Sequence, residues 1–505
     1  MEKFSKSTAD VDYQIIIAGC GPAGAAAAIE LGMQNIKTLV LEKYSNPLLS
    51  PRAQYLNSRT ISLLKRWGVF DKLSNQTLLN KDFPQSVTWQ SDLKADPIAV
   101  GSLKSKGLRI PLYITENILR ERLSELPSVT LLKNHEVVDV EVSKDTTKVS
   151  VINEDNLHCS FSSNYIIACD GANSIVRQKC KIPFLELGPK RQMLSILFKA
   201  SNLKLQVKNL SMMYLCLTKD GASAIGPIDL RTKEEIWYAQ IQYPEKDLPT
   251  KKLASEILDE VAGLKIDKDI INHHLWQMQV QIAEYFTYDQ KVFLISDSAH
   301  AFAPTGGFGL NTGFGDVSNL CWKIASVIHK QQNSNILSTY ESERRPVAIR
   351  NLHAAEKNAQ DRIFAKDNIQ NLSKISDKQV NAKHLTHAYA YLYSSLTKLN
   401  RLQPLDEIKK NNDYIANADP GYFLSEVFID DKSIYEGLSR TEWSLLIVGD
   451  HNINTNTNLP DAISILKLPE GTYPHKYILL RPDWHISATF ENLPKSIALP
   501  YSQIF

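Results

Sequence analysis

The sequence predicts an α/β protein in which a parallel sheet is interrupted by a second β-sheet and followed by a small mixed domain. Three observations lead to this prediction. A short apolar strand at 13–18 runs directly into a glycine-rich turn and an alanine-rich helix. Residues 190–245 then change to β-rich runs, and residues 410–505 contain two further strand candidates. A chain of 505 residues is too long for one compact core, so two or three domains are expected.

The composition is that of an ordinary globular protein. Hydrophobic residues make up 43% and charged residues 22%, and a net charge of +2 without a long basic block gives no support to nucleic-acid or membrane-surface binding. Residues 1–12 do not have the form of a secretory signal, and no run of about 18 apolar residues predicts a membrane span. The six cysteines are scattered without a CxxC pair, so we expect no disulfide framework, no metal site and a cytoplasmic location.

The first motif is a glycine turn between the strand at 13–18 and a helix that runs to about Met33. Its three glycines permit, in order, a tight turn, close approach of the backbone to a pyrophosphate, and close packing of helix on strand. The helix N-terminus offers N–H groups to the anion. A second strand at 37–41 ends at Glu42, whose carboxylate can accept hydrogen bonds from a ribose. These features predict a Rossmann-like dinucleotide site; the turn reads Gly19-Cys20-Gly21-Pro22-Ala23-Gly24.

Two later stretches repeat the form of a strand followed by glycine. The strand at 165–169 leads into Asp170-Gly171, and the strand at 292–295 leads through Asp297 to a glycine-rich stretch, 304–313. We interpret its four glycines and Pro304 as lying ahead of an amphipathic helix at 317–329, where they form a backbone surface suited to a flat ligand. The other expected elements are strands at 192–200, 212–217, 235–243, 444–448 and 477–480 and a helix at 255–263.

Together with the stretch 51–60, these motifs resemble the class A flavoprotein aromatic hydroxylases, the family of para-hydroxybenzoate, phenol and polyketide hydroxylases. The resemblance covers most of the chain, and the motifs stand in the expected order. It implies an FAD-binding domain formed by 1–180 and 285–400 and a β-sheet substrate domain at 181–284. It also implies a thioredoxin-like domain at 410–505, which lacks a CxxC pair because no cysteine follows Cys321.

The resemblance implies roles for individual residues. Asp297 is expected to bond the flavin ribityl chain, and Arg52 is expected to reach the pyrophosphate. The backbone at 310–311 is expected to face the flavin pyrimidine edge, with Pro304 beside the position where oxygen adds and Gln54 near the isoalloxazine. The full set of expected cofactor-binding residues is Gly19, Gly21, Pro22, Ala23, Gly24, Glu42, Lys43, Arg52, Thr115, Asp170, Gly171, Asp297, Pro304, Gly307, Gly309, Leu310 and Asn311.

The implied activity is that of a monooxygenase. NADPH or NADH reduces FAD, the reduced flavin forms a hydroperoxide with dioxygen, and one oxygen passes to a phenolic or polyketide-type ring. Pro304, Gln54, Tyr214 and Tyr238 are the candidate catalytic residues, although either tyrosine can instead be ordinary strand packing. His300 is either a structural hydrogen-bonding residue or an acid–base group. A flavin oxidase or dehydrogenase and a non-catalytic flavin-binding accessory protein remain alternatives, and a monomer and a homodimer are both compatible with the sequence.

The sequence departs from the family pattern at four positions. Ser296 stands where relatives have glycine, so its Cβ is expected to alter the turn or crowd the ribityl chain. Phe308 replaces a glutamine or lysine and is expected to line the pocket. Thr115 replaces a glutamine that meets the pyrophosphate. Gln54 replaces the acidic group that assists phenol hydroxylases, so their catalytic base is not expected here.

Overall fold

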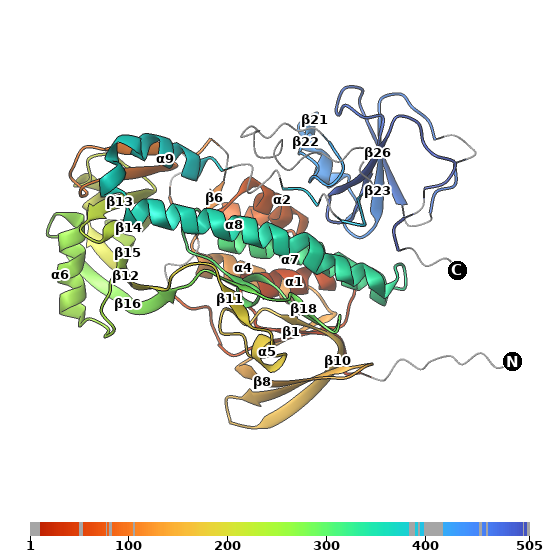
Figure 1. Cartoon of the computed structure of the whole chain (residues 1–505), viewed down its shortest axis with the longest axis horizontal. Helices are drawn as coiled ribbons and strands as arrows, with labels where there is room; N and C mark the ends of the chain where they lie inside the picture. Colours follow the sequence, from red (N-terminus) through yellow and green to blue (C-terminus); the bar gives the residue numbers. More distant parts are fainter. Residues whose placement is uncertain are drawn as a thin grey trace.

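The computed structural model has three parts, which Figure 1 shows as a first sheet with its helices, a second sheet at the left and a C-terminal domain at the upper right. Arg52 and the junction between the expected domains, residues 401–409, lie outside the described residues. Among the described helices, none combines the length and apolarity needed to cross a membrane. The residues described are 11–49, 54–76, 78–79, 83–104, 107–382, 389–391, 394–397, 418–453, 457–460, 463–497 and 499–501.

The first sheet has eight strands, six of them in the order β18-β19-β10-β1-β2-β7. The strands from β19 to β7 are parallel, with Ala18 beside both Leu41 and Ala168, so the predicted α/β fold is confirmed. The antiparallel β8–β9 hairpin extends from β10. The strands are β1 (Tyr13–Ala18), β2 (Thr38–Glu42), β7 (Val129–Lys133), β8 (His135–Val142), β9 (Thr147–Asn153), β10 (His158–Ala168), β18 (Thr287–Tyr288) and β19 (Val292–Leu294).

Helix α1 packs between the first sheet and two further helices, α4 and α7. It begins at Pro22, where the missing N–H is not needed, and its alanines at 25–28 are fully buried because only small side chains fit between sheet and helix. Helix α7 begins at Phe308, nine residues before the predicted start. The helices of this part are α1 (Pro22–Gly32), α2 (Ser58–Arg66), α3 (Phe70–Ser74), α4 (Leu112–Leu123), α5 (Ile175–Lys179) and α7 (Phe308–Ile328), with the 3₁₀ turn η2 (Ser296–Ser298).

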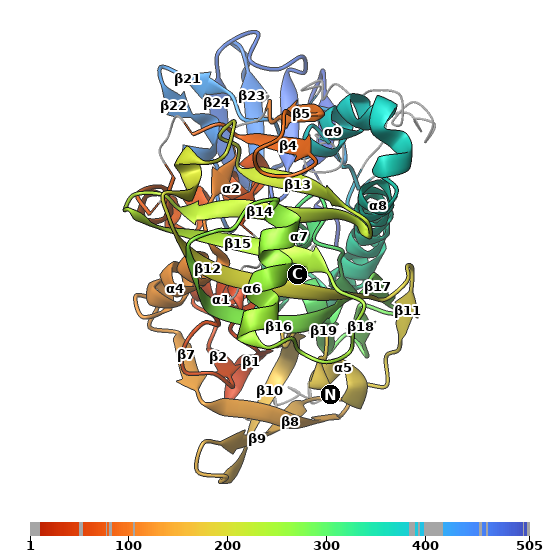
Figure 2. The ribbon, with the colours of Figure 1, turned by 90° about the vertical axis from the view of Figure 1, so that its left-hand side faces the viewer.

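The second sheet has seven strands in the order β16-β12-β15-β14-β13-β4-β5. Helix α6 covers one face of this sheet (Figure 2), and the apolar side chains of Leu194, Trp237 and Leu258 pack between them. Met193, Tyr238 and Gln240 alternate with that set along the strands and therefore lie on the opposite face, which we call the inner face. The elements are β4 (Ser86–Gln90), β5 (Ala99–Ser102), β12 (Arg191–Ser201), β13 (Met213–Thr218), β14 (Gly221–Asp229), β15 (Glu234–Gln242), β16 (Lys268–Met278), α6 (Lys251–Ala262) and η1 (Leu203–Leu205).

The expectation that the second sheet is confined to 181–284 is wrong. β4 and β5 belong to this sheet, because β4 pairs in parallel with the edge strand β13 and buries an edge that would otherwise be exposed. Helix α9 then packs on β5, where Ser376 contacts Gly101. The remaining elements around the two sheets are β3 (Tyr55–Leu56), β6 (Leu108–Arg109), β11 (Phe184–Glu186), β17 (Gln281–Ala283), β20 (His300–Ala301), η3 (Ser334–Ser338), α8 (Thr339–Ile363), η4 (Lys366–Asn371) and α9 (Leu372–Val380).

The C-terminal domain is built on a four-stranded sheet in the order β24-β23-β25-β26. β23 and β24 are parallel, whereas β25 and β26 are antiparallel to their neighbours. The thioredoxin-like character of this domain stays a prediction. Arg481 fastens this domain to α8 through two bonds to Glu343, at 2.7 and 2.9 Å, in an interior closed to solvent. The elements are β21 (Phe428–Ile429), β22 (Lys432–Ser433), η5 (Ile434–Glu436), β23 (Trp443–Val448), β24 (Ile463–Leu468), β25 (Tyr477–Leu480) and β26 (Ile486–Phe490).

Candidate active site

The three glycine-and-aspartate motifs meet at the carboxyl ends of three adjacent parallel strands, β1, β10 and β19. The N–H of Cys169 donates to the carbonyl of Ala18 at 2.7 Å, which joins the second motif to the first. The carbonyl of Ala168 accepts from Ser298 Oγ at 2.7 Å and from the N–H of Ile295 at 3.1 Å, which joins the third motif to the second. Ligands of open α/β sheets bind at this edge of the sheet.

The glycines of the first two motifs have two different functions. A Cβ on Gly19 would lie 2.5 Å from the carbonyl oxygen of Cys169, and a Cβ on Gly24 would overlap the carbonyl of Gly19. These two glycines are therefore required for packing. Gly21 and Gly171, by contrast, have no atom within 4 Å of an added Cβ, so they face open space on the side where a ligand can approach the backbone.

Glu42 lies at the end of β2 and holds the first turn in place. Its Oε2 accepts the N–H of Cys20 at 2.7 Å, and its Oε1 accepts the N–H of Tyr44 at 2.9 Å. Arg120 of α4 lies 3.3 Å from the same carboxylate and donates to the carbonyl of Cys20 at 2.9 Å. Arg120 was missed by the sequence analysis; its only signal was a Glu116 one helical turn earlier. Lys43, by contrast, is exposed, 3.9 Å from a glutamate of β8.

Three polar atoms beside this turn are buried and have no hydrogen-bond partner among the described residues. They are Thr115 Oγ1, Arg120 Nη1 and Asp170 Oδ1. Burial also raises the pKa of Asp170, although its other oxygen accepts the N–H of Val176 at 3.1 Å. Each unsatisfied buried polar atom costs on the order of 1–3 kcal/mol. These atoms, together with the open space at Gly21, fit a polar ligand with phosphate and hydroxyl groups.

Ser296 adopts a backbone conformation that glycine favours. Its φ of 55° lies in the left-handed region, and its N–H donates to Asp316 Oδ2 at 3.1 Å. The serine tolerates this left-handed conformation and directs its Oγ toward Gly313. Asp297, the next residue, is exposed on the 3₁₀ turn η2.

Asp316 is the centre of a buried cluster beneath the third motif. It accepts from His300 Nε2 at 2.6 Å and from Arg344 Nε at 2.7 Å, and all three side chains are fully buried. Burial alone would raise the pKa of Asp316, but His300 and Arg344 outweigh it and hold that pKa below its ordinary value. His300 is thus placed as a structural hydrogen-bonding residue.

The start of α7 differs from the surface that the sequence analysis expected. Only Gly306 and Gly307 precede the helix, whereas Gly309 and Gly313 lie within it. A Cβ has no room on Gly313, but on Gly309 it would make only ordinary contacts with Phe302. Phe308 is 2% exposed and belongs to the main core, so the expectation that it lines the pocket is wrong. An aromatic ring at the first helical position packs inward here.

Asn311 connects α7 to the segment that begins at Gln54. Its Nδ2 donates to the carbonyls of Tyr55, at 3.0 Å, and of Gly307, at 2.7 Å. Its Oδ1 accepts the N–H of Asn57 at 3.0 Å and the hydroxyl of Thr60 at 2.6 Å. The side chain of Asn311 therefore fixes β3 and the start of α2 against the glycine turn. Leu310, beside it, is half-buried against the main core.

Gln54 and Tyr238 are brought together by an arginine that the sequence analysis missed. Arg109 of β6 donates from Nη2 to Gln54 Oε1 at 2.7 Å, and its guanidinium carbon lies 5.9 Å from the centre of the Tyr238 ring. Tyr238 belongs to the inner face of the second sheet. These three side chains form a polar group. It lies beside the third motif, because Gln54 directly precedes Tyr55, whose side chain packs next to Gly307.

Tyr214 lies on the other face of the same sheet. It is fully buried under α6, its ring is stacked 6.3 Å from that of Trp237, and its hydroxyl donates to the carbonyl of Asn209 at 2.8 Å. The expectation that Tyr214 contacts a substrate is therefore wrong. An even or odd position along a strand decides the face, and the sequence alone did not fix which face was covered.

A cavity separates the inner face of the second sheet from the third motif and α8. Pro304 lies at its border and is exposed toward it. The walls combine apolar and amide side chains with two arginines. Its lining includes Arg191, Met193, Ala224, Gln240, Met278 and Arg362.

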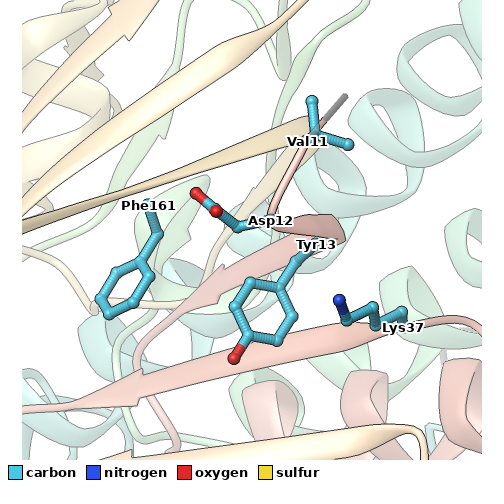
Figure 3. A pocket seen from close by; sticks show the side chains of 5 residues that line it. All are labelled: Val11, Asp12, Tyr13, Lys37 and Phe161. Carbon is cyan, nitrogen blue, oxygen red and sulfur yellow. The ribbon is translucent and has the colours of Figure 1, made fainter. Parts of the chain in front are cut away.

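A second indentation lies at the opposite edge of the first sheet (Figure 3). It is lined by Val11, Asp12, Tyr13, Lys37 and Phe161, at the amino ends of β1 and β2. Asp12 is already bonded to the N–H and hydroxyl of Ser162, both at 2.8 Å. Because the motifs end at the carboxyl edge, this indentation is no part of the candidate site.

Comparison with known proteins agrees with this geometry. The family described as FAD binding domain matches residues 12–355. A 3-(3-hydroxy-phenyl)propionate/3-hydroxycinnamic acid hydroxylase of Burkholderia vietnamiensis is 27% identical over 345 residues, which cover 66% of this chain and 60% of the relative. A 12-dehydrotetracycline 5-monooxygenase/anhydrotetracycline 6-monooxygenase of Streptomyces rimosus is 27% identical over 368 residues, 68% of this chain and 69% of the relative. The chain spans about three fifths of the length of the first curated relatives that it matches.

Among solved structures, the rebeccamycin biosynthetic enzyme RebC with reduced flavin superimposes with a TM-score of 0.83. It is 20% identical, and the match covers 95% of this chain and 96% of that one. The similarity therefore extends through the C-terminal domain and concerns the fold.

Proposed function

The chain belongs to the FAD binding domain family, and from this premise we propose that it is an FAD-dependent monooxygenase that uses NAD(P)H to hydroxylate an aromatic substrate. The observation that carries the proposal is the cavity between Pro304 and the inner face of the second sheet. A cavity with apolar walls and a few polar groups, beside a cofactor site, is where a small-molecule substrate is expected to bind.

The residues that would hold FAD surround the meeting point of the three motifs. Gly21 and the start of α1 would receive the pyrophosphate, and Thr115 and Arg120 have unused donors for it. Asp170 has an unused acceptor, and Glu42 lies where an adenosine ribose is expected. When bound, FAD supplies the redox chemistry that connects NAD(P)H with dioxygen.

The start of α7 would stabilise the ring system of the cofactor. The first N–H groups of a helix have no partner within it, and the helix dipole makes this end positive. Gly307, with a φ of 66°, turns the chain so that α7 begins immediately after it. These N–H groups would therefore favour negative charge on the reduced ring without any rearrangement.

The second sheet would orient the substrate and exclude water. Met193 and Ala224 line the cavity and offer apolar contact for a ring. Tyr238 lies on the same face of the sheet, near Arg109, and would offer its hydroxyl to a phenolic oxygen. Exclusion of water matters because water discharges activated oxygen without hydroxylating the substrate. The two relatives named above are a hydroxylase of 3-(3-hydroxy-phenyl)propionate and a monooxygenase of 12-dehydrotetracycline and anhydrotetracycline, which supports a phenolic or polyketide-type substrate.

The proposal is tested with the purified FAD-loaded protein, a panel of phenols and ¹⁸O₂. We expect NADPH or NADH consumption to rise in the presence of a substrate and one ¹⁸O atom to appear in the product. Peroxide formed in proportion to NAD(P)H, with no labelled product from any phenol, would instead indicate an oxidase. A yellow protein that no phenol stimulates would favour the accessory-protein alternative.

Two matched tyrosine variants test the placement of the cavity. Tyr238→Phe removes a hydroxyl from the inner face and is expected to lower kcat/KM about tenfold, the loss of roughly one hydrogen bond in the transition state. Tyr214→Phe removes a hydroxyl from the face under α6 and is expected to lower stability while kcat/KM stays unchanged. The reverse pattern would contradict the assignment of the inner face.

A further inference from the structure

Two guanidinium groups near the cavity have no acidic partner among the residues that the structure describes. Arg109 lies in β6, and Arg362 lies in the last turn of α8, where its side chain lines the cavity. Arg109 Nη1 and Arg362 Nε are closed to solvent and form no hydrogen bond with any residue that the structure describes. Within the same described residues, neither side chain forms an ion pair. Two cationic groups are therefore held partly out of water with unused donors.

Both guanidinium groups interact electrostatically with the same phenol, that of Tyr238. The guanidinium of Arg109 lies 5.9 Å from its ring centre, and a negative charge on Tyr238 would raise the pKa of either arginine. Tyr238 shares the inner face with Gln240 and Gln242, which line the cavity. The two guanidinium groups and Tyr238 thus belong to one region at the cavity.

A third arginine in the same wall is neutralised by a carboxylate. Arg191 lines the cavity and donates to both oxygens of Glu356, at 2.6 and 2.8 Å. In the described part of the chain, Arg362 has no such carboxylate partner, and burial lowers its pKa to about 10. The charge of Arg191 is therefore balanced by Glu356, whereas the charge of Arg362 is not balanced by any described carboxylate.

The fold gains little from an unpaired cation in this position. Moving a charge out of water without a partner carries a large desolvation penalty, and the favourable field at the C-terminal end of a helix offsets only a small part of it. Arg362 has a planar donor fork that matches the geometry of a carboxylate. A carboxylate on a bound ligand would pair with Arg362 and offset this desolvation penalty.

We propose that the substrate of this cavity is an aromatic acid, whose carboxylate is bound by Arg362 with Arg109 as a second positive charge beside Tyr238. The inference rests on the proposed function for the location of the substrate. It goes further by assigning the substrate a negative charge, and it names Arg362 as a specificity-determining residue. The phosphate of NADPH is the other anion that can approach this site, and the experiment separates the two.

The test measures binding to the oxidised FAD-loaded enzyme, without NAD(P)H, by the change in flavin absorbance. The probes are 3-(3-hydroxyphenyl)propionate and 3-hydroxy-2-naphthoate, each compared with its uncharged primary amide. The wild-type enzyme is expected to bind at least one acid about tenfold more tightly than its amide, the usual gain of a charge-assisted hydrogen bond. Equal binding of acid and amide in both pairs, or binding of neither acid, would overturn the proposal.

Three variants test whether Arg362 causes the tighter binding of the acid than of its amide. Arg362→Gln is expected to abolish the preference for the acid while amide binding changes by less than about twofold, and Arg362→Lys is expected to retain part of it. Lys366→Gln removes the same charge from an exposed position one turn further on and serves as the control. Thermal unfolding checks that each variant folds. A preference that persists in Arg362→Gln would overturn the assignment, as would a variant that loses only NADPH affinity relative to NADH.

The result is distinguishable from failure of the proposed function. Binding is read without turnover, whereas hydroxylation is read from ¹⁸O incorporation. If the enzyme prefers the acid but incorporates no oxygen, the proposed anion site is supported and the proposed monooxygenase activity is contradicted. If the enzyme hydroxylates only neutral phenols, the proposed monooxygenase activity is supported and the proposed anion site is contradicted.

Discussion

The side chain of Ser296 occupies the space that a Cβ on Gly313 would need. Such a Cβ would lie 2.5 Å from Ser296 Oγ and 2.8 Å from its Cβ. Two positions separated by a turn and the first part of α7 are therefore coupled: the serine that replaces a glycine requires a glycine in the helix beside it.

This coupling predicts a non-additive pair of substitutions. Gly313→Ala is expected to lower the free energy of unfolding by about 1–3 kcal/mol, because the added methyl has no room. In a Ser296→Gly background the same change should cost little or even stabilise, since alanine is the better helix former by about 1 kcal/mol. Urea unfolding of the two single variants and the double variant measures the coupling. Strictly additive effects would contradict the contact.

The first motif predicts different outcomes for two of its glycines. Gly21→Val is expected to fold normally, because its φ of −65° suits any residue, but to weaken FAD binding roughly 10- to 100-fold by filling the ligand side of the turn. Gly24→Val is expected not to fold, because its Cβ would overlap the carbonyl of Gly19. Circular dichroism and FAD titration of the apoprotein distinguish the two. Unchanged FAD affinity in Gly21→Val would remove this turn from the cofactor site.

Substitution of Thr115 is expected to change the stability of the apoprotein and its affinity for FAD in opposite directions. Thr115→Val removes a buried hydroxyl without a described partner, so the apoprotein should be unchanged or up to about 1 kcal/mol more stable, while FAD affinity should fall about 5- to 10-fold. Thr147→Val is the control, because its hydroxyl donates to the carbonyl of Ser163 at 3.0 Å, far from the motifs. That variant should lose stability and keep its FAD affinity. A stability loss in Thr115→Val with unchanged affinity would show that its hydroxyl serves the fold.

His485 predicts how stability depends on pH. Burial lowers its pKa to about 3, although Asp483 opposes this effect. The unfolded chain, in which the histidine pKa is about 6.5, therefore binds a proton that the folded chain does not. The contribution of His485 to stability is complete above about pH 6.5 and declines as the pH falls toward 3, by up to about 1.4 kcal/mol per pH unit.

The measurement is urea unfolding between pH 5 and 8, a range above the titration of most carboxylates. His485→Gln should flatten the decline below pH 6.5, whereas the same change at the exposed His329 should leave it intact. An unchanged slope in His485→Gln would mean that other groups carry the acid sensitivity.

Much of the fold was predictable because it depends on short-range requirements. Tyr13–Ala18, the alanines of α1 and Glu42 stand within thirty residues of one another, and each has a local reason to be where it is. The same holds for three strands of the second sheet, β12, β13 and β15, whose expected bounds agree with the observed bounds to within one residue. The other strands of that sheet, β4, β5, β14 and β16, were not predicted. Alternation along a strand predicts two faces but does not tell which one a helix will cover, and this is why Tyr214 was misplaced.

The sequence by itself determined the parallel sheet, the three motifs and their order, because glycines at turns and apolar strands act over a few residues. Only the tertiary structure decided that β4 and β5 join the second sheet, that α7 begins at Phe308, and that Arg120 supports the first turn. It also decided which arginines are paired and which are not. The physical reason is that ion pairing and burial depend on distances between atoms far apart in the chain: Arg191 and Glu356 are separated by 165 positions and still meet at 2.6 Å.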